Sequence, residues 1–437
     1  MSVENAGKPA ADHRPAHLPL QGVRILAVEQ FGASPYGTMF LAHMGADVIK
    51  IENPSTDGDP SRRTGPYMLG ENDGLYFQSW NSNKRSLVLD IKSEDGRKAL
   101  ESLVTEADVV INNLRGDQPK KLKLDYAALA ALNPAIVCVH ISAYGRETSR
   151  ASWPGYDYLM QAETGLMHLT GEPDTPPARI GAPSIVDHMT GMTSMVGLLS
   201  ALLRARETGE GCDVDTSLFD VTLHQLGYTA TWLLNHGHMT ERQERSGHYS
   251  LAPVQTFPTA DGWIFIMCMT QKFWDALLPK IGREDLATLP QFASPGTRHD
   301  HRRELTDILD EVFRQHPTDY WLARLQGALP VAPVRNLADT LRDDFVAECG
   351  MLSVMSHPKQ EELQILSNPL KFNGQRPALR SCSALGADTE AILSSLGASR
   401  AWSTESENRP QREQFLPDLQ PATSKPDRLL AKGETSE

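Results

Sequence analysis

Apolar runs alternate with amphipathic segments through the first half of the chain. Runs rich in Val, Ile and Leu predict strands at 22–30, 47–53, 85–91, 108–113 and 135–145. Between them, apolar positions three or four residues apart predict helices at 34–46, 93–107 and 125–133. Strands that alternate with helices through short loops are typical of a parallel sheet, so this part is expected to form a Rossmann-like α/β layer.

The pattern changes in the second half of the chain. A nearly unbroken apolar helix is predicted from Ile185 to a Gly stop at 209–211, followed by a strand at 212–217 and a long helix at 218–237. A hairpin is predicted at 252–269 with Asp261-Gly262 as its turn, and amphipathic helices follow at 272–282 and 302–316. These elements predict a smaller α+β domain, after which 329–341 leads the chain back to the first domain.

The predicted organisation therefore has two domains and two disordered tails. The large domain is expected at 19–225, the small domain at 226–335, and a return segment that completes the large domain at 336–398. Residues 1–18 are rich in Pro, Ala and His, and 399–437 are rich in Pro, Ser and Glu, so both ends are expected to be disordered.

Composition narrows the class of protein. A net charge of −13 over 437 residues argues against a nucleic-acid or anionic-membrane partner. Because no apolar run approaches the ~20 residues that span a bilayer, and no secretory signal is recognisable, a cytoplasmic protein is expected. The five cysteines are scattered without metal-binding spacing, which fits a reducing compartment.

The common catalytic and nucleotide-binding motifs are missing. The loop after the first strand reads QFGASPYG, which lacks the glycine spacing of a dinucleotide site. H-E-x-x-H, Walker A and G-x-S-x-G do not occur either. Neither a metal nor a tightly bound cofactor is therefore expected.

One acidic residue attracts attention, because Asp187 stands at the mouth of the long apolar helix. Asp is a favoured helix N-cap, and a cap stabilises a helix by ~1 kcal/mol. A carboxylate held at a helix start in a closed pocket can also be a covalent nucleophile. Spacing alone leaves both interpretations open.

Several basic residues stand in loops or at strand ends of the predicted sheet. Ligands of parallel sheets usually bind at such positions, so these residues are candidates for a phosphate-binding patch. Ordinary surface charge is the alternative. They include Arg62, Arg63, Lys92, Arg115, Lys120, Lys121, Lys123 and the NKRS stretch at 83–86.

The chain as a whole resembles the family III CoA-transferases, which include formyl-CoA, carnitine and bile-acid CoA-transferases and are related to the α-methylacyl-CoA racemases. The resemblance extends from about residue 18 to 397. It rests on motifs in the family's order, among them GDPSRR, WNSNKRSLVLDIKSEDGRKAL, ADVVINNLR, VDHMTGM, LPVAPVRN and NPLKFNG.

The resemblance implies a fold and a chemistry. Two chains are expected to thread through each other as interlocked rings in a homodimer, each with a large domain built from both chain ends. Asp187 matches the family's nucleophilic aspartate, which passes through a mixed anhydride and an aspartyl-CoA thioester. Coenzyme A is then a substrate, carried in as a thioester.

The resemblance also assigns other site residues. Lys92 and Arg62 match basic residues that contact CoA, Arg115 matches the arginine of the usual N-x-R-P-G motif, and Lys121 replaces an arginine. Tyr144 matches a pocket tyrosine. Gly32 stands where formyl-CoA transferase has an active-site glutamine.

The choice between transferase and racemase rests on one position. Racemases pair the aspartate with a histidine in G-H-D, whereas this chain reads G-Y-D with Tyr156. An unperturbed tyrosine has a pKa of about 10 and is a poor proton shuttle near neutrality. The expected function is transfer of CoA from an acyl-CoA, succinyl-CoA or acetyl-CoA, to a small carboxylic acid. A dicarboxylate is expected from the resemblance and from cations such as Arg179. A racemase is the alternative enzyme, and a non-catalytic CoA-binding protein is the alternative of another class.

Overall fold

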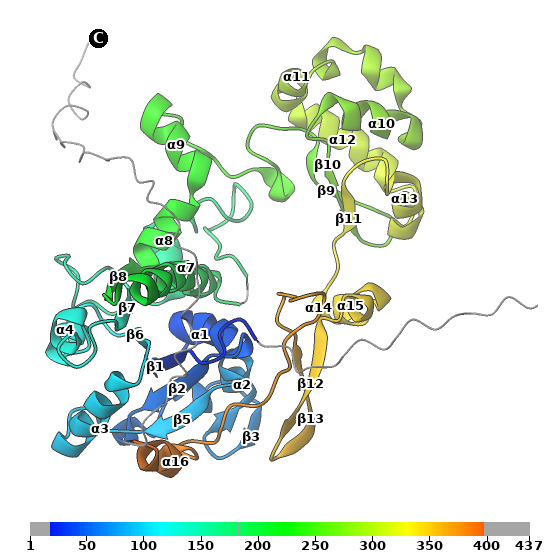
Figure 1. Cartoon of the computed structure of the whole chain (residues 1–437). Coiled ribbons are helices and arrows are strands. Elements are labelled where there is room, and N and C mark those ends of the chain that lie inside the picture. Colours follow the sequence, from blue (N-terminus) through cyan, green and yellow to red (C-terminus); the bar gives the residue numbers. More distant parts are fainter. Residues whose placement is uncertain (1–17, 182, 397–437) are drawn as a thin grey trace, which may run out of the picture. The chain divides into compact units, whose positions relative to one another are not determined.

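The computed structural model describes residues 18–181 and 183–396 (Figure 1). Six strands form one sheet in the order β5-β2-β1-β6-β7-β8, and every neighbouring pair is parallel. The α/β fold with a parallel central sheet, predicted from the sequence, is confirmed. The strands are β1 (Arg24–Val28), β2 (Asp47–Glu52), β5 (Arg85–Val88), β6 (Val109–Asn112), β7 (Val137–Ser142) and β8 (Cys212–Ser217).

The sheet buries both of its faces, which explains why its central strands are apolar without interruption. On β1, Ile25 and Ala27 face one hydrophobic cluster, and Leu26 faces the other. The first cluster is covered by α1 (Ala33–His43) and α7 (Ile185–Thr208), and the second by α3 (Glu94–Thr105) and α16 (Thr389–Ser394). Figure 1 shows α1 and α7 on one side of the sheet and α3 on the other.

Shorter helices connect these elements. The sequence predicted one helix over 218–237, and this prediction was wrong, because Gly227 adopts φ +53° and the chain forms two helices there. The helix predicted at 125–133 is also shorter. The connecting helices are α2 (Leu75–Asn81), α4 (Gln118–Lys121), α5 (Tyr126–Leu129), α6 (Asp157–Glu163), α8 (Leu218–Gln225) and α9 (Gly227–His236), and a small hairpin joins β3 (Met68–Gly70) to β4 (Asp73–Gly74).

A separate hydrophobic core, apart from the two clusters that flank the large sheet, forms within 254–333. The predicted hairpin is confirmed, because β9 (Val254–Pro258) and β10 (Trp263–Met267) pair antiparallel around the Asp261-Gly262 turn, and β11 (Val331–Pro333) adds a third strand. Trp274, Phe313 and Trp321 are buried in this core. The surrounding helices are α10 (Gln271–Ile281), α11 (Pro295–Asp300), α12 (Arg302–Phe313) and α13 (Thr318–Leu325).

The end of the described chain runs along the edge strand of the large sheet. After α14 (Leu337–Leu341), α15 (Asp344–Glu348) and the hairpin of β12 (Leu352–His357) and β13 (Gln360–Leu366), it reaches β5. The Ser86 amide donates to Asp388 Oδ2 at 2.9 Å, and the Val88 amide donates to Thr389 Oγ1 at 3.1 Å. These side chains occupy backbone groups that an open sheet edge would leave unpaired. The domain boundaries drawn from the sequence stay predictions, and the predicted disordered tails lie almost wholly outside the described residues.

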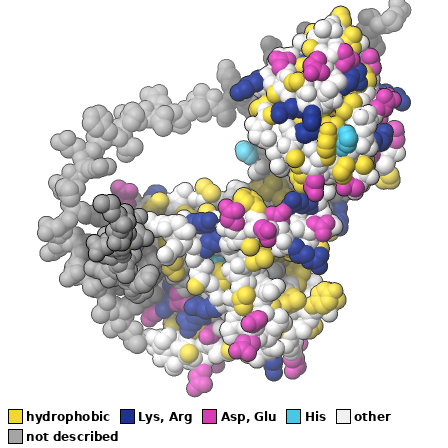
Figure 2. Space-filling view, turned by 90° about the vertical axis from the view of Figure 1, so that its right-hand side faces the viewer, with side chains coloured by type: hydrophobic (Ala, Val, Ile, Leu, Met, Phe, Trp, Pro, Cys, Tyr) yellow, Lys and Arg dark blue, Asp and Glu magenta, His cyan; other side chains and the backbone are white. Residues whose placement is uncertain are grey.

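None of the helices within 18–181 and 183–396 combines the length and apolarity needed to cross a lipid bilayer. Acidic and basic side chains are interspersed over the face seen in Figure 2.

Two glycines bring α1 and α7 into close contact. A Cβ atom on Gly191 would stand 2.4 Å from the carbonyl oxygen of Ala33, and one on Gly37 would stand 2.8 Å from the carbonyl oxygen of Gly191. Only hydrogen atoms fit at this crossing. The contact brings the beginning of α1 beside the beginning of α7, which is where the candidate site lies.

We expect Gly191→Ala to destabilise the protein, because its methyl group would push against the backbone of α1. Overpacking of this kind costs about 1–3 kcal/mol, which outweighs a gain in helix propensity of about 1 kcal/mol. Gly296→Ala in α11 is the matched control, since the nearest atom to its Cβ would be 4.0 Å away. Thermal unfolding should show a lowered Tm for Gly191→Ala only, and equal Tm values for the two variants would contradict this packing.

Candidate active site

Asp187 lies in the first turn of α7, but another acid caps the helix. The Asp157 carboxylate, on α6, accepts the Val186 amide at 2.6 Å and the Asp187 amide at 3.1 Å, both through Oδ2. Ser184, at the cap position itself, forms no side-chain cap within the described residues. Of the two roles that the sequence left open for Asp187, helix capping is performed by Asp157. The Asp187 carboxyl is therefore free for another role.

The surroundings of Asp187 disfavour its charged form. Burial, and then the neighbouring Asp157 carboxylate, raise the pKa of Asp187 to about 7. A poorly solvated carboxylate with a raised pKa is also more basic than an exposed one, and hence a better nucleophile when it is ionised. Perturbed carboxyls of this kind are common in active sites.

Gly32 stands against the carboxyl of Asp187. A Cβ atom at Gly32 would lie 2.2 Å from Asp187 Oδ2, so no residue with a side chain fits without moving the acid. Gly32 is also the N-cap residue of α1. Two helix starts thus meet at one carboxyl, and the structure brings together two residues that the sequence had singled out separately.

The loop before Gly32 is held by side chains from two other loops, Asn113 after β6 and Asp59 after β2. Asn113 accepts the amide of Gln30 at 2.9 Å and donates to its carbonyl at 2.6 Å. The next residue, Phe31, adopts φ +55°, an unfavourable conformation for a residue with a large side chain. Its amide donates to Asp59 Oδ1 at 3.2 Å. Such a conformation persists only when the surrounding contacts fix it.

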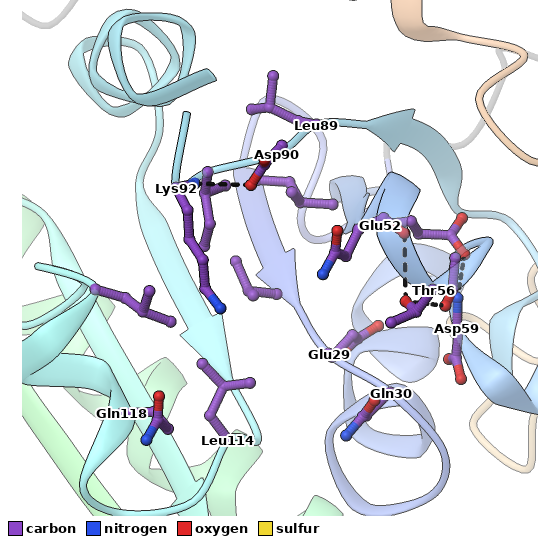
Figure 3. Close-up of a pocket in the computed structure, with 16 residues that line it drawn as sticks. Glu29, Gln30, Glu52, Thr56, Asp59, Leu89, Asp90, Lys92, Leu114 and Gln118 are labelled. Carbon is purple, nitrogen blue, oxygen red and sulfur yellow. Dashed lines mark hydrogen bonds between the residues drawn. The ribbon is translucent and has the colours of Figure 1, made fainter. Parts of the chain in front are cut away.

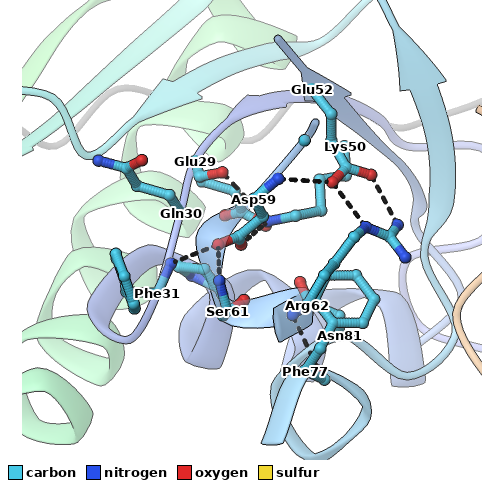
Figure 4. A network of polar contacts seen from close by, with 12 residues as sticks. Glu29, Gln30, Phe31, Lys50, Glu52, Asp59, Ser61, Arg62, Phe77 and Asn81 are labelled. Carbon is cyan, nitrogen blue, oxygen red and sulfur yellow. Dashed lines mark hydrogen bonds and ion pairs between the residues drawn. The ribbon is translucent and has the colours of Figure 1, made fainter. Parts of the chain in front are cut away.

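A buried ionic network lies beneath this loop (Figure 4). Lys50 Nζ pairs with Asp59 Oδ2 at 2.8 Å and donates to the carbonyl of Glu29 at 3.1 Å. The Glu29 carboxylate accepts Lys84 Nζ at 2.7 Å. Burial opposes ionisation of these carboxylates, but the lysines keep the pKa of both Glu29 and Asp59 below ordinary values. The network therefore fixes both ends of the loop that touches Asp187.

Arg62 belongs to the same network. It is fully buried, forms two hydrogen bonds to Glu52 at 2.7 and 2.8 Å, and its guanidinium lies 3.8 Å from the centroid of the Phe77 ring. The sequence marked Arg62 as a CoA contact. The structure places it in the interior, where its contacts are structural.

Lys92 lines a cavity at the carboxyl ends of β1, β2 and β5 (Figure 3). The cavity has a volume of about 220 Å³, and the Lys92 side chain extends along it. Gln30 also lines it, so the cavity begins two residues from Gly32. Parallel sheets usually bind ligands at this edge.

Arg115 and Lys121 flank the cavity through their neighbours Leu114 and Leu122, which line it. Lys121 Nζ lies 2.6 Å from Asp117 Oδ2, and Arg115 Nε lies 3.7 Å from Asp117 Oδ1. Both cations are exposed. Both side chains are accessible to solvent at the rim of the cavity, and each contacts Asp117.

The two predicted tyrosines are placed differently. Tyr156 is 60% exposed and its ring meets the edge of Phe31, with the centroids 6.2 Å apart, so it stands over the loop beside Asp187. Tyr144 donates its hydroxyl to Glu163 at 2.8 Å, and burial together with that carboxylate raises the pKa of Tyr144.

Sequence reasoning missed several residues of the site. His188 stacks on Tyr36 with ring centroids 3.9 Å apart, and burial lowers its pKa. Within the described residues, His188 Nε2 is buried without a hydrogen-bond partner. Asp157 was also missed, and its place in G-Y-D was the only available signal. No group of His, Cys, Asp and Glu in the described chain is arranged to hold a metal ion.

Comparison with known proteins gives consistent matches. The profile of the family described as CoA-transferase family III matches residues 20–389. Succinyl-CoA:mesaconate CoA-transferase of Haloarcula marismortui is 34% identical over 367 residues, 82% of this chain and 91% of that protein. Succinate–glutarate CoA-transferase of Agrobacterium fabrum is 32% identical over 339 residues, 76% of this chain and 84% of that protein. A CaiB/BaiF family protein of Brucella suis, solved by crystallography, is 33% identical with a TM-score of 0.76, covering 87% of this chain and all of that one.

The raised pKa of Asp187 predicts a pH-dependent stability. The folded protein binds this proton more tightly than the unfolded chain, whose ordinary value is near 4, so stability present below pH 4 is lost as the pH rises through about 7. The full pKa shift would correspond to about 4 kcal/mol of the free energy of unfolding. Because water reaches this half-buried carboxyl, we expect a loss of free energy of unfolding on the order of 1–2 kcal/mol.

Asp187→Asn should remove this loss. Relative to the wild type, its free energy of unfolding should rise between pH 5 and pH 8, measured by denaturant titration at each pH. Asp319→Asn, an exposed acid in the first turn of α13, is the control and should show no such rise. A constant difference between Asp187→Asn and wild type across this range would contradict the raised pKa.

Proposed function

Because the chain belongs to CoA-transferase family III, we propose that it moves coenzyme A from an acyl-CoA donor, succinyl-CoA or acetyl-CoA, to a small dicarboxylic acid. The family expected from the sequence is thus confirmed, and the substrates are our proposal. The observation that carries it is the Asp187 carboxyl, which is desolvated and relieved of helix capping by Asp157. The curated relatives named above, whose names specify mesaconate and glutarate, support a dicarboxylate acceptor.

The first half of the proposed reaction loads CoA onto the enzyme. The Asp187 carboxylate attacks the thioester carbonyl of the donor, forming an aspartyl-acyl anhydride and releasing CoA as a thiolate. The thiolate then attacks the aspartyl carbonyl. This step forms the aspartyl-CoA thioester and releases the donor acid as a carboxylate.

The second half runs the same steps in the opposite order. The acceptor carboxylate attacks the aspartyl-CoA carbonyl, giving a new anhydride and free CoA thiolate. The thiolate attacks the acceptor's carbonyl, and Asp187 leaves as the carboxylate it was at the start. Every leaving group is the next nucleophile, so the cycle needs neither an external base nor a metal.

The start of α1 supports this chemistry. Gly32 caps α1 beside the Asp187 carboxyl, so the positive end of this helix dipole lies near the reacting carbonyl, whereas the first amides of α7 already donate to Asp157. Negative charge develops on that carbonyl oxygen in each tetrahedral intermediate. Backbone N–H groups that are already in place stabilise such charge without reorganisation.

We assign the CoA nucleotide to the cavity beside Gln30. Lys92 is its lining cation, and Arg115 and Lys121 at the rim supply further positive charge for phosphates. Arg62 is buried against Glu52 and has no part in this assignment. Gly32, which stands against Asp187, and Tyr156, whose ring meets Phe31, belong to the acyl end of the site.

The remaining expectations are also proposals. We propose a cytoplasmic enzyme without a resident cofactor, acting as an interlocked homodimer. Apolar side chains at the surface of one chain support a partner surface, since Leu203 on α7 is 72% exposed and Leu234 on α9 is 81% exposed. Light scattering would measure the number of chains in the assembly.

The racemase is the weaker alternative. It needs a second acid–base group opposite Asp187, and the racemase histidine is replaced here by the exposed Tyr156. Uptake of deuterium at the α-carbon of a 2-methylacyl-CoA, without CoA transfer, would favour it. CoA binding without turnover of any acid would favour a non-catalytic protein.

Asp187→Ala should lower kcat for transfer from succinyl-CoA by at least about a thousandfold, because no other group forms the covalent intermediate. Incubation of wild type with acyl-CoA and then borohydride should convert Asp187 to homoserine by reducing the aspartyl thioester, which mass spectrometry would detect. Asp319→Asn should keep full activity. Full transfer by Asp187→Ala would exclude the proposed mechanism.

Lys92→Ala should raise KM for the acyl-CoA about tenfold and leave kcat nearly unchanged, as expected for loss of one charge-assisted hydrogen bond in the ground and transition states. Lys98→Ala is the control, because that lysine is 65% exposed and, among the described residues, pairs only with Glu94 on its own helix. Steady-state kinetics measures both constants. An unchanged KM would show that the nucleotide binds elsewhere.

A further inference from the structure

Arg179 is a cation without a carboxylate partner in the described residues. Its guanidinium lies 4.8 Å from the centroid of the Tyr158 ring, and no ion pair or hydrogen bond of this side chain is found within 18–181 and 183–396. The residue is exposed. An aromatic ring under a guanidinium holds it in place while its N–H groups stay available, since the ring occupies only its flat face.

A chain of hydrogen bonds fixes this part of the backbone to the nucleophile. The amide of Ile180 donates to Gln161 Oε1 at 2.9 Å, and Gln161 Nε2 donates to Asp157 Oδ1 at 2.6 Å. The other oxygen of Asp157 accepts the amide of Asp187. Gln161 and Asp157 are both buried. The residue after Arg179 is therefore coupled to the start of α7 through two buried side chains.

Aromatic side chains lie near Asp187 and near Arg179. Tyr158 lies on α6 beside Asp157, one residue along the chain. Trp80 meets His188, the residue after Asp187, with ring centroids 5.7 Å apart in an edge-to-face arrangement. Burial, and then the charges of Asp187, Asp59 and Tyr158, raise the pKa of Tyr76 to about 12. Tyr76 in turn packs edge-on against Trp80, with centroids 4.7 Å apart. Aromatic rings thus lie beside both ends of this region, Trp80 next to His188 and Tyr158 under Arg179.

We propose that Arg179 binds the distal carboxylate of a dicarboxylic acid whose other carboxylate reacts at Asp187. This inference rests on the proposed function and names the residue that selects its substrate class. A dicarboxylate brings two negative charges to a site that already contains Asp157 and Asp187. Repulsion would disfavour it without a cation, and a planar guanidinium can bind a carboxylate through two parallel hydrogen bonds. The aromatic side chains near both ends suit an aliphatic carbon chain.

The test compares acids of equal length with one or two carboxylates. CoA transfer from acetyl-CoA, a donor with no second carboxylate, would be measured with glutarate against valerate and with succinate against butyrate. Arg179→Gln should lower kcat/KM for the dicarboxylates about 10- to 100-fold and leave the values for the monocarboxylates unchanged or higher. Arg179→Lys should retain part of the selectivity, because it keeps the charge but loses the paired geometry.

Arg342→Gln is the control, since that arginine is exposed at the end of α14, and it should change neither acid class. Equal losses for both acid classes in Arg179→Gln, or no loss at all, would overturn the role of Arg179 while leaving the transferase intact. Absence of transfer by the wild type from both acetyl-CoA and succinyl-CoA to every acid would instead overturn the proposed function. If acetyl-CoA alone fails, the same acids compared with succinyl-CoA as donor decide the role of Arg179.

Discussion

The hydrogen bonds that Asp157 accepts from the start of α7 organise the site. One oxygen of this buried carboxylate takes two amides of the helix, and the other takes Gln161, which holds the backbone at Ile180. An amide donor at a helix start is normally satisfied by the helix's own cap residue. Here the cap comes from a different helix, 30 residues earlier in the chain, so the same bonds also join α6 to α7. The negative charge of Asp157 then acts on Asp187 and helps to raise its pKa.

The opposite side of Asp187 depends on buried charge. Lys50 and Asp59 form an ion pair of 2.8 Å beneath the loop. Lys50 donates to the carbonyl of Glu29, and Asp59 accepts the amide of Phe31. Asn113 accepts the amide of Gln30, the residue between them. Burying ions costs free energy, and a buried pair often contributes little net stability. What this pair provides is position. It keeps Phe31 in a left-handed conformation, which turns the chain so that Gly32 meets Asp187.

The sequence predicted the parallel sheet because its strands carry an uninterrupted apolar pattern. It singled out Asp187 as a candidate nucleophile because the motifs around that residue are local. It could not predict that Asp157 caps α7, since that depends on where two helices meet in space. Arg62 was expected at a ligand because it is charged and follows a loop, but its partner Glu52 stands on an interior strand, which charge patterning does not reveal. The break at Gly227 was missed for a different reason, because a helical apolar pattern continues across it. Arg179 could be noted from the sequence only as a positive charge, and its position over Tyr158 is a tertiary contact.

The fit of Gly32 against Asp187 has a bearing on side reactions. With backbone packed against one side of the carboxyl, a reagent can reach its carbon only from the side that remains open. In the proposed cycle the CoA thiolate, the acceptor acid and water all compete for that single approach. Whichever molecule occupies it shuts out the others, so a bound acid protects the aspartyl thioester from hydrolysis simply by being there. The ratio of CoA transferred to thioester hydrolysed then depends on the fraction of time for which a substrate occupies the open side of the Asp187 carboxyl.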